Sequence, residues 1–149
     1  MAITQAVCNS FKKELLVGAH DFDASSGDTF KLALYTSSAS LSASTTAFTT
    51  SNEVSGTGYS SGGASLTSID PALDSSTAVC DFSNLTFSTV TVTARGAMIY
   101  NSTPNTTSAS LTNPACVILN FGSDITATAG DFTITFPAAG ASTAIIRLA

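Results

Sequence analysis

The sequence TVTVTA at residues 89–94 places a polar side chain and an apolar one at alternate positions. The sequence FTITF at residues 132–136 repeats this pattern, and FKLALY at residues 30–35 alternates Phe30, Leu32 and Leu34 with the residues between them. Successive side chains of a strand point to opposite faces, so a period of two predicts strands with one buried face. These three stretches predict the core of a β protein.

Other apolar runs predict further strands at residues 77–82, 97–100, 114–121 and 145–148. Residues typical of turns separate the runs, at positions 25–28, 62–63, 70–71, 101–105, 122–124 and 129–131. No strand–helix–strand alternation is present, which argues against a parallel sheet. The sequence therefore predicts a single mainly β domain over residues 1–149, an antiparallel β-sandwich of jelly-roll or immunoglobulin-like type.

One helix is expected at the N-terminal end. Ile3, Val7, Phe11 and Leu15 recur every four residues, which gives an apolar stripe of helical period. Thr4 suits the N-cap of such a helix, and a glycine at position 18 suits the position after its C-cap. We expect a helix over residues 4–17 that packs on its own sandwich.

The composition argues for binding or assembly and against catalysis. The chain has 23 Ser, 23 Thr, one His and no Trp, with only five basic and ten acidic residues. Hydroxyl groups are weak nucleophiles without an activating base. We expect a protein that is not an enzyme and has no cofactor.

Charge and hydropathy exclude two classes of partner. A net charge of −5 and a pI near 4.3 argue against nucleic acid, whose phosphates require clustered basic residues. No apolar run approaches the roughly 20 residues of a membrane span, and the N-terminal residues lack a signal-peptide pattern. Cys8, Cys80 and Cys116 form no CxxC pair, so buried free thiols are expected in a cytoplasmic setting, with one disulfide as the alternative.

Two motifs suggest chemistry and are better explained as turns. GYSSG at residues 58–62 matches a nucleophile elbow around Ser60, but no helical pattern follows it and the one His, at position 20, precedes it. DFDASSGD at residues 21–28 resembles the start of a calcium loop, yet Ser26 and Leu32 occupy the positions that require Gly and Glu. We expect no metal site and a partly exposed His20, while a looser carboxylate site remains the alternative.

The segment 36–68 is rich in Ser, Thr, Ala and Gly and has few apolar residues. Such a long connection within a compact domain is typical of a functional or partly disordered segment. Tyr59 is its one candidate for stacking on a sugar ring. We expect the segment to gain its order from contacts with a neighbouring subunit.

Six stretches together carry a resemblance to a known group. They are NSFKKELL (9–16), KLALYT (31–36), NEVSGTGYSSGG (52–63), ARGAMIYN (94–101), GDFTITFP (130–137) and IIRLA (145–149). In this order they resemble a group of short virion structural proteins of tailed bacteriophages that look like capsid decoration, or cement, proteins. The 52–63 block is the most specific part, and the group implies no catalytic residues.

The resemblance implies a non-enzymatic decoration protein that stabilises the shell of the major capsid protein as a homo-oligomer. Its location would be the virion, assembled in the host cytoplasm, with the major capsid protein or other virion proteins as partners. The alternative is a neck-, tail- or fibre-associated structural protein, or a receptor- or glycan-binding module. The residues expected at an interface are Asn52, Glu53, Val54, Gly56, Gly58, Tyr59, Gly62 and Gly63.

Overall fold

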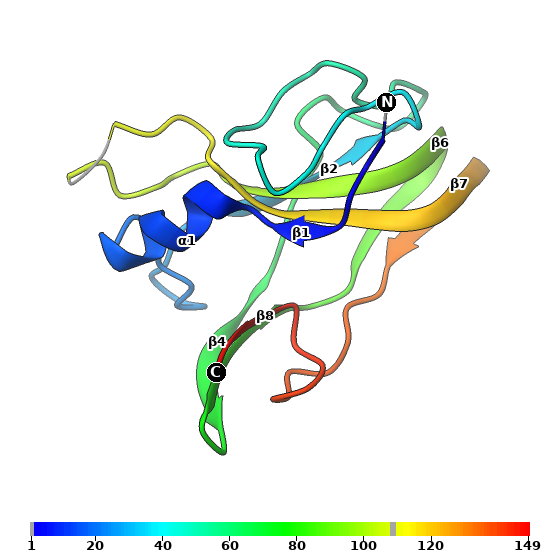
Figure 1. Cartoon of the computed structure of the whole chain (residues 1–149). Coiled ribbons are helices and arrows are strands. Elements are labelled where there is room, and N and C mark those ends of the chain that lie inside the picture. Colours follow the sequence, from blue (N-terminus) through cyan, green and yellow to red (C-terminus); the bar gives the residue numbers. More distant parts are fainter. Residues whose placement is uncertain (1, 108–109) are drawn as a thin grey trace.

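The computed structural model describes residues 2–107 and 110–149 and is 47% strand and 5% helix. The larger antiparallel sheet has the order β1 (Ala6–Val7), β7 (Ala115–Ile134), β6 (Leu85–Asn101), β2 (Phe30–Tyr35) and β3 (Ala64–Ser65). The smaller one has the order β4 (Ser68–Asp74), β5 (Thr77–Phe82) and β8 (Ile146–Leu148). The helix α1 (Asn9–Leu16) lies beside the larger sheet (Figure 1). The predicted mainly β fold is confirmed and is consistent with a sandwich, whereas its jelly-roll or immunoglobulin-like type stays a prediction.

The strands β6 and β7 form one long, curved ribbon (Figure 1). Their pairing runs from Leu85↔Ile134 to Tyr100↔Ala115, and its register shifts at four places. Thr89 and Ala129 have left-handed backbone angles near two of these shifts, with φ of 54° and 46°. Extra residues in one strand bend a β-ribbon and increase its twist, which accounts for the curvature.

Several predicted turns are therefore irregularities within strands. Residues 122–124 and 129–131 lie inside β7, so the two strands expected on either side of them are one strand. Residues 97–100 likewise continue β6. The predicted turn at residues 70–71 is wrong in the same way, because Pro71 lies inside β4 beside a register shift. Glycine and proline suit a strand bulge or an edge strand as well as a turn, so the local sequence does not separate these cases.

The helix is shorter than expected. It begins at Asn9 rather than near Thr4, because Ala6 and Val7 pair with Ile118 and Val117 of β7. Pairing with a neighbouring strand thus overrides the helical period of the first apolar residues. Gly18 has a φ of 70° just beyond the helix, as expected for the residue after the C-cap. Phe11 is fully buried and packs edge-on against Phe22, so the helix covers its own domain.

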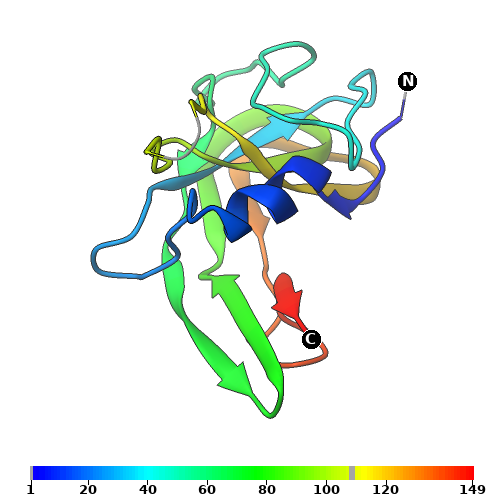
Figure 2. The same ribbon diagram turned by 60° about the vertical axis from the view of Figure 1, so that its left-hand side comes forward.

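One hydrophobic cluster joins both sheets. Phe30 of β2 stacks on Phe22, with ring centroids 4.2 Å apart, and lies 5.8 Å from Phe82 of β5. The β4–β5 hairpin then extends away from this core as an arm, with β8 along its side (Figure 2). Part of the arm is not covered by other elements, because every residue of β4 after Ser68 is exposed.

The three cysteines are free, and Cys8 and Cys116 are buried while Cys80 is half-buried. Their thiols behave as small apolar groups, because burial raises the pKa of Cys8 to about 11. Within residues 2–107 and 110–149, no helix has the length and apolar character needed to cross a bilayer.

Candidate functional site: the 52–63 loop and the pocket in the bend of β7

The 52–63 loop lies along the parts of β2 and β6 that have no neighbouring strand on that side. The Val54 amide donates to the Leu34 carbonyl oxygen at 2.9 Å, which attaches the start of the loop to β2. The Thr91 amide donates to the Thr57 carbonyl oxygen at 2.9 Å, which attaches its middle to β6. These bonds satisfy strand edges that would otherwise face water.

Glycines in the loop permit this close approach. A Cβ at Gly56 would collide with the Thr91 carbonyl oxygen, and a Cβ at Gly63 would collide with that of Leu32. Gly63 also has a φ of 71°, a conformation that favours glycine. Gly56 and Gly63 thus bring the loop backbone onto its own sheet, and their predicted place at an interface between subunits stays a prediction.

The Glu53 carboxylate organises the turn of the loop. Its Oε1 accepts hydrogen bonds from the Tyr59 hydroxyl at 2.8 Å and the Gly62 amide at 2.6 Å. Its Oε2 accepts one from the Ser61 hydroxyl at 2.7 Å. The Tyr59 oxygen in turn accepts from the Leu34 amide at 2.9 Å. Burial raises the pKa of Tyr59, so its hydroxyl stays protonated and donates to Glu53.

The predicted interface residues differ in their access to solvent. Asn52, Gly56 and Gly58 are exposed; Glu53, Tyr59 and Gly63 are half-buried; Val54 and Gly62 are buried. The segment 36–68 was expected to gain its order from a neighbouring subunit, but it packs against its own domain. Its few apolar residues are well placed, with Leu41 and Val54 only 2% and 4% exposed and Phe48 stacked on Tyr100. That the exposed residues contact another subunit stays a prediction.

Ser60 and His20 are not brought together as a catalytic pair. Ser60 is exposed on the loop, while the His20 side chain is fully buried, so the predicted partial exposure of His20 is wrong. Its Nε2 lies 2.8 Å from Glu14 Oε2, and its Nδ1 lies 3.0 Å from Asn101 Nδ2. An amide nitrogen only donates, so Nδ1 accepts and the ring proton on Nε2 is donated to Glu14. Both ring nitrogens are thus occupied within a structural network.

The acidic loop at residues 21–28 is closed by its own hydrogen bonds. Asp23 Oδ1 accepts from the amide and hydroxyl groups of both Ser25 and Ser26, at 2.7–3.0 Å. These bonds, the one from the Ser25 hydroxyl first, lower the pKa of Asp23 to about 2. Among residues 2–107 and 110–149, no group of three or more His, Cys, Asp or Glu side chains is arranged to hold a metal ion.

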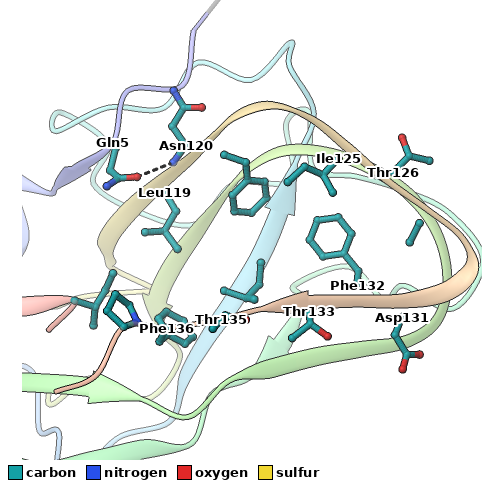
Figure 3. Close-up of a pocket in the computed structure, with 15 residues that line it drawn as sticks. Gln5, Leu119, Asn120, Ile125, Thr126, Asp131, Phe132, Thr133, Thr135 and Phe136 are labelled. Atoms are coloured by element: carbon teal, nitrogen blue, oxygen red, sulfur yellow. Dashed lines mark hydrogen bonds between the residues drawn. The ribbon is translucent and has the colours of Figure 1, made fainter. Parts of the chain in front are cut away.

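A pocket of about 380 Å³ lies in the bend of β7 (Figure 3). Leu119 and Phe121 line it from the first half of the strand, and Phe132 and Phe136 line it from the returning half and the residues that follow. Gln5, Asn120, Thr126, Asp131, Thr133 and Thr135 add polar groups. An apolar floor with a few polar groups is typical of ligand or side-chain recognition sites. Phe132 and Phe136 belong to the hydrophobic core, as their strand pattern predicts. The pocket itself could not be predicted from that pattern, because the bend of β7 is needed to bring the Phe132 ring within 6.0 Å of the Phe121 ring.

Comparison of the chain with protein-family models, with curated proteins and with solved structures finds no match.

Proposed function

We propose that this chain is a non-enzymatic virion structural protein that decorates the capsid and binds the major capsid protein as a homo-oligomer. The proposal rests on the β4–β5 arm with β8 beside it (Figure 2), because Leu73 and Leu148 of this small sheet are exposed. Exposed apolar side chains on strands with open edges are typical of surfaces that are covered in an assembly. The resemblance of six sequence stretches to phage virion proteins supports the same role.

The internal bonding of the titratable groups supports a role without catalysis. His20 has both ring nitrogens engaged by Glu14 and Asn101, so it is not available as a base for Ser60. The Glu53 carboxylate, close to Ser60 in the chain, accepts three hydrogen bonds from its own loop. These residues hold the fold together rather than facing a substrate.

The copy number of the protein in purified phage particles tests the proposal. Quantitative mass spectrometry should find it at a level comparable to that of the major capsid protein, because decoration proteins cover the shell. Capsids that lack it should lose their shell at a lower temperature than complete capsids. A level of only a few copies per particle would place the protein at the neck, tail or fibre, and its absence from particles would refute a virion role.

The pocket in the bend of β7 favours a glycan- or receptor-binding module as the second candidate. Phe121 is half-buried there, and Gln5 and Asp131 supply hydrogen-bonding groups of the kind that recognise sugar hydroxyls. Glycan-array binding that is lost in Phe121→Ala, together with a low copy number in particles, would favour this candidate over decoration.

A further inference from the structure

A continuous apolar surface crosses the small sheet and reaches the helix. Leu73 of β4 pairs with Ala78 of β5, which pairs with Leu148 of β8, so the three side chains form a row on one face. Leu148 also lines a groove of about 250 Å³ between β8 and α1, together with Leu15 and Leu16. Leu16, Leu73 and Leu148 are 89%, 76% and 59% exposed. Large apolar side chains with such exposure, adjacent to one another, mark an interaction surface.

The two outer strands of the small sheet each have an open edge. In the described part of the chain, the order β4-β5-β8 pairs both β4 and β8 with β5 alone. Pro71 and the register shift after Ile69 interrupt the edge of β4, so that the regular stretch beyond the shift consists of residues 72–74. This stretch matches the length of β8, which has 3 residues. Two short edges of equal length are suited to pair with one another between subunits.

The charges around the two edges are opposite. Lys12 and Arg147 line the groove beside β8, and Lys13 is exposed on the same helix, in a chain that has five basic residues in all. The β4 strand instead carries Asp70 and Asp74, both exposed. Each carboxylate accepts one intramolecular bond, from the Ala24 and Ala141 amides respectively, which holds the acidic groups in place along β4.

We propose that the β8 edge and its groove bind the β4 edge of a second copy of this chain. Leu73 of one subunit would contact Leu148 and Leu16 of the next, while Asp70 and Asp74 approach Lys12 and Arg147. Because the two contacting surfaces differ, each subunit keeps one open edge, and the association closes into a ring or continues as a filament. The proposal deepens the assembly role given above and rests on it.

Two variants test the contact, one for each edge. Leu73→Lys places a positive charge in the β4 surface that must meet the basic groove, and Leu148→Asp places a charge in the apolar groove itself. Analytical ultracentrifugation should show that the wild-type chain forms oligomers larger than dimers and that each variant alone is monomeric. An equimolar mixture should form heterodimers, because Leu148→Asp keeps an intact β4 edge and Leu73→Lys keeps an intact β8 edge.

Ile125→Ser is the matched control, since Ile125 is a 44% exposed apolar residue on β7 outside the row, and this variant should oligomerise like the wild type. Circular dichroism establishes that the variants are folded. A monomeric wild type, single variants that oligomerise like the control, or a mixture that stays monomeric would each overturn the proposal. The particle measurement is separate: a chain that oligomerises in solution but is absent from virions would refute only the virion role.

Discussion

Asp81 shows how one buried carboxylate ties the stability of this protein to pH. It is 1% exposed, and its Oδ2 has no hydrogen-bond partner among the described residues. Burial raises its pKa, against the opposing effect of hydrogen bonds from the Phe82 and Ile145 amides. An aspartate with a raised pKa in the folded state binds its proton more tightly there than in the unfolded chain, where its pKa is about 3.9.

Protonated Asp81 should therefore stabilise the folded state fully below the pKa of the unfolded chain. This stabilisation should be lost as the pH rises through the raised pKa of the folded state. We expect Asp81→Asn to be more stable than the wild type at neutral pH, since it removes a buried charge and keeps the acceptor for the Phe82 amide. Thermal unfolding followed between acidic and neutral pH checks this. Equal losses of stability with rising pH in both proteins would mean that another group is responsible.

Glu53 is the second residue with a measurable role in stability. Glu53→Ala leaves the Tyr59 hydroxyl and the Gly62 amide without their acceptor, and should lower the free energy of unfolding by about 2–3 kcal/mol. Ser61→Ala removes a single exposed donor from the same carboxylate and should cost less than about 1 kcal/mol. Chemical denaturation of the two variants provides the comparison. Similar losses would show that the carboxylate does not organise the loop.

At the scale of elements, alanine substitutions at two glycines can distinguish the cost of backbone strain from the cost of lost close packing. Gly63 and Gly122 both have left-handed backbone angles, with φ of 71° and 82°. A Cβ at Gly63 would collide with the Leu32 carbonyl oxygen, whereas a Cβ at Gly122 would have nothing within 4 Å. Gly122→Ala should thus cost about 1 kcal/mol from strain alone, and Gly63→Ala should cost several times more because the loop must move off β2. Equal costs in denaturation would show that the loop is not held closely there.

At the scale of the whole molecule, hydrogen exchange can tell the internal role of the 52–63 loop from its predicted role at an interface. The amides of Val54, Tyr59 and Gly63 are hydrogen-bonded within the subunit and should be protected already in the free protein. Exposed Gly56 and Gly58 should gain protection only on assembly. Mass spectrometry of free subunit and particle should show this division. Unchanged hydrogen exchange at Gly56 and Gly58 on assembly would contradict the prediction that the loop lies at an interface.

Local sequence patterns were sufficient to predict strands, and their buried face, where polar and apolar residues alternate regularly; β2 is an exception, because Ala33 and Tyr35 on its second face are buried as well. Val90, Val92 and Ala94 are buried while Thr91 and Thr93 are exposed, as their period of two predicts. The residues predicted for a strand at 77–82 form β5 with the same bounds. These features are local, because the alternation of side chains follows from the geometry of a single strand.

How far these strands continue, and which strands pair, depends on contacts between residues that are distant in the sequence. Residues such as Gly122 and Pro71 are compatible with a turn, a bulge or an edge strand, and pairing with a distant strand chooses among them. The same holds for the pocket, which exists because a bend brings Phe121 opposite Phe132, and for the row from Leu73 to Leu148. The residues that form the pocket and the row are far apart in the chain. Both features therefore depend on the register of the whole sheet, which no local pattern specifies.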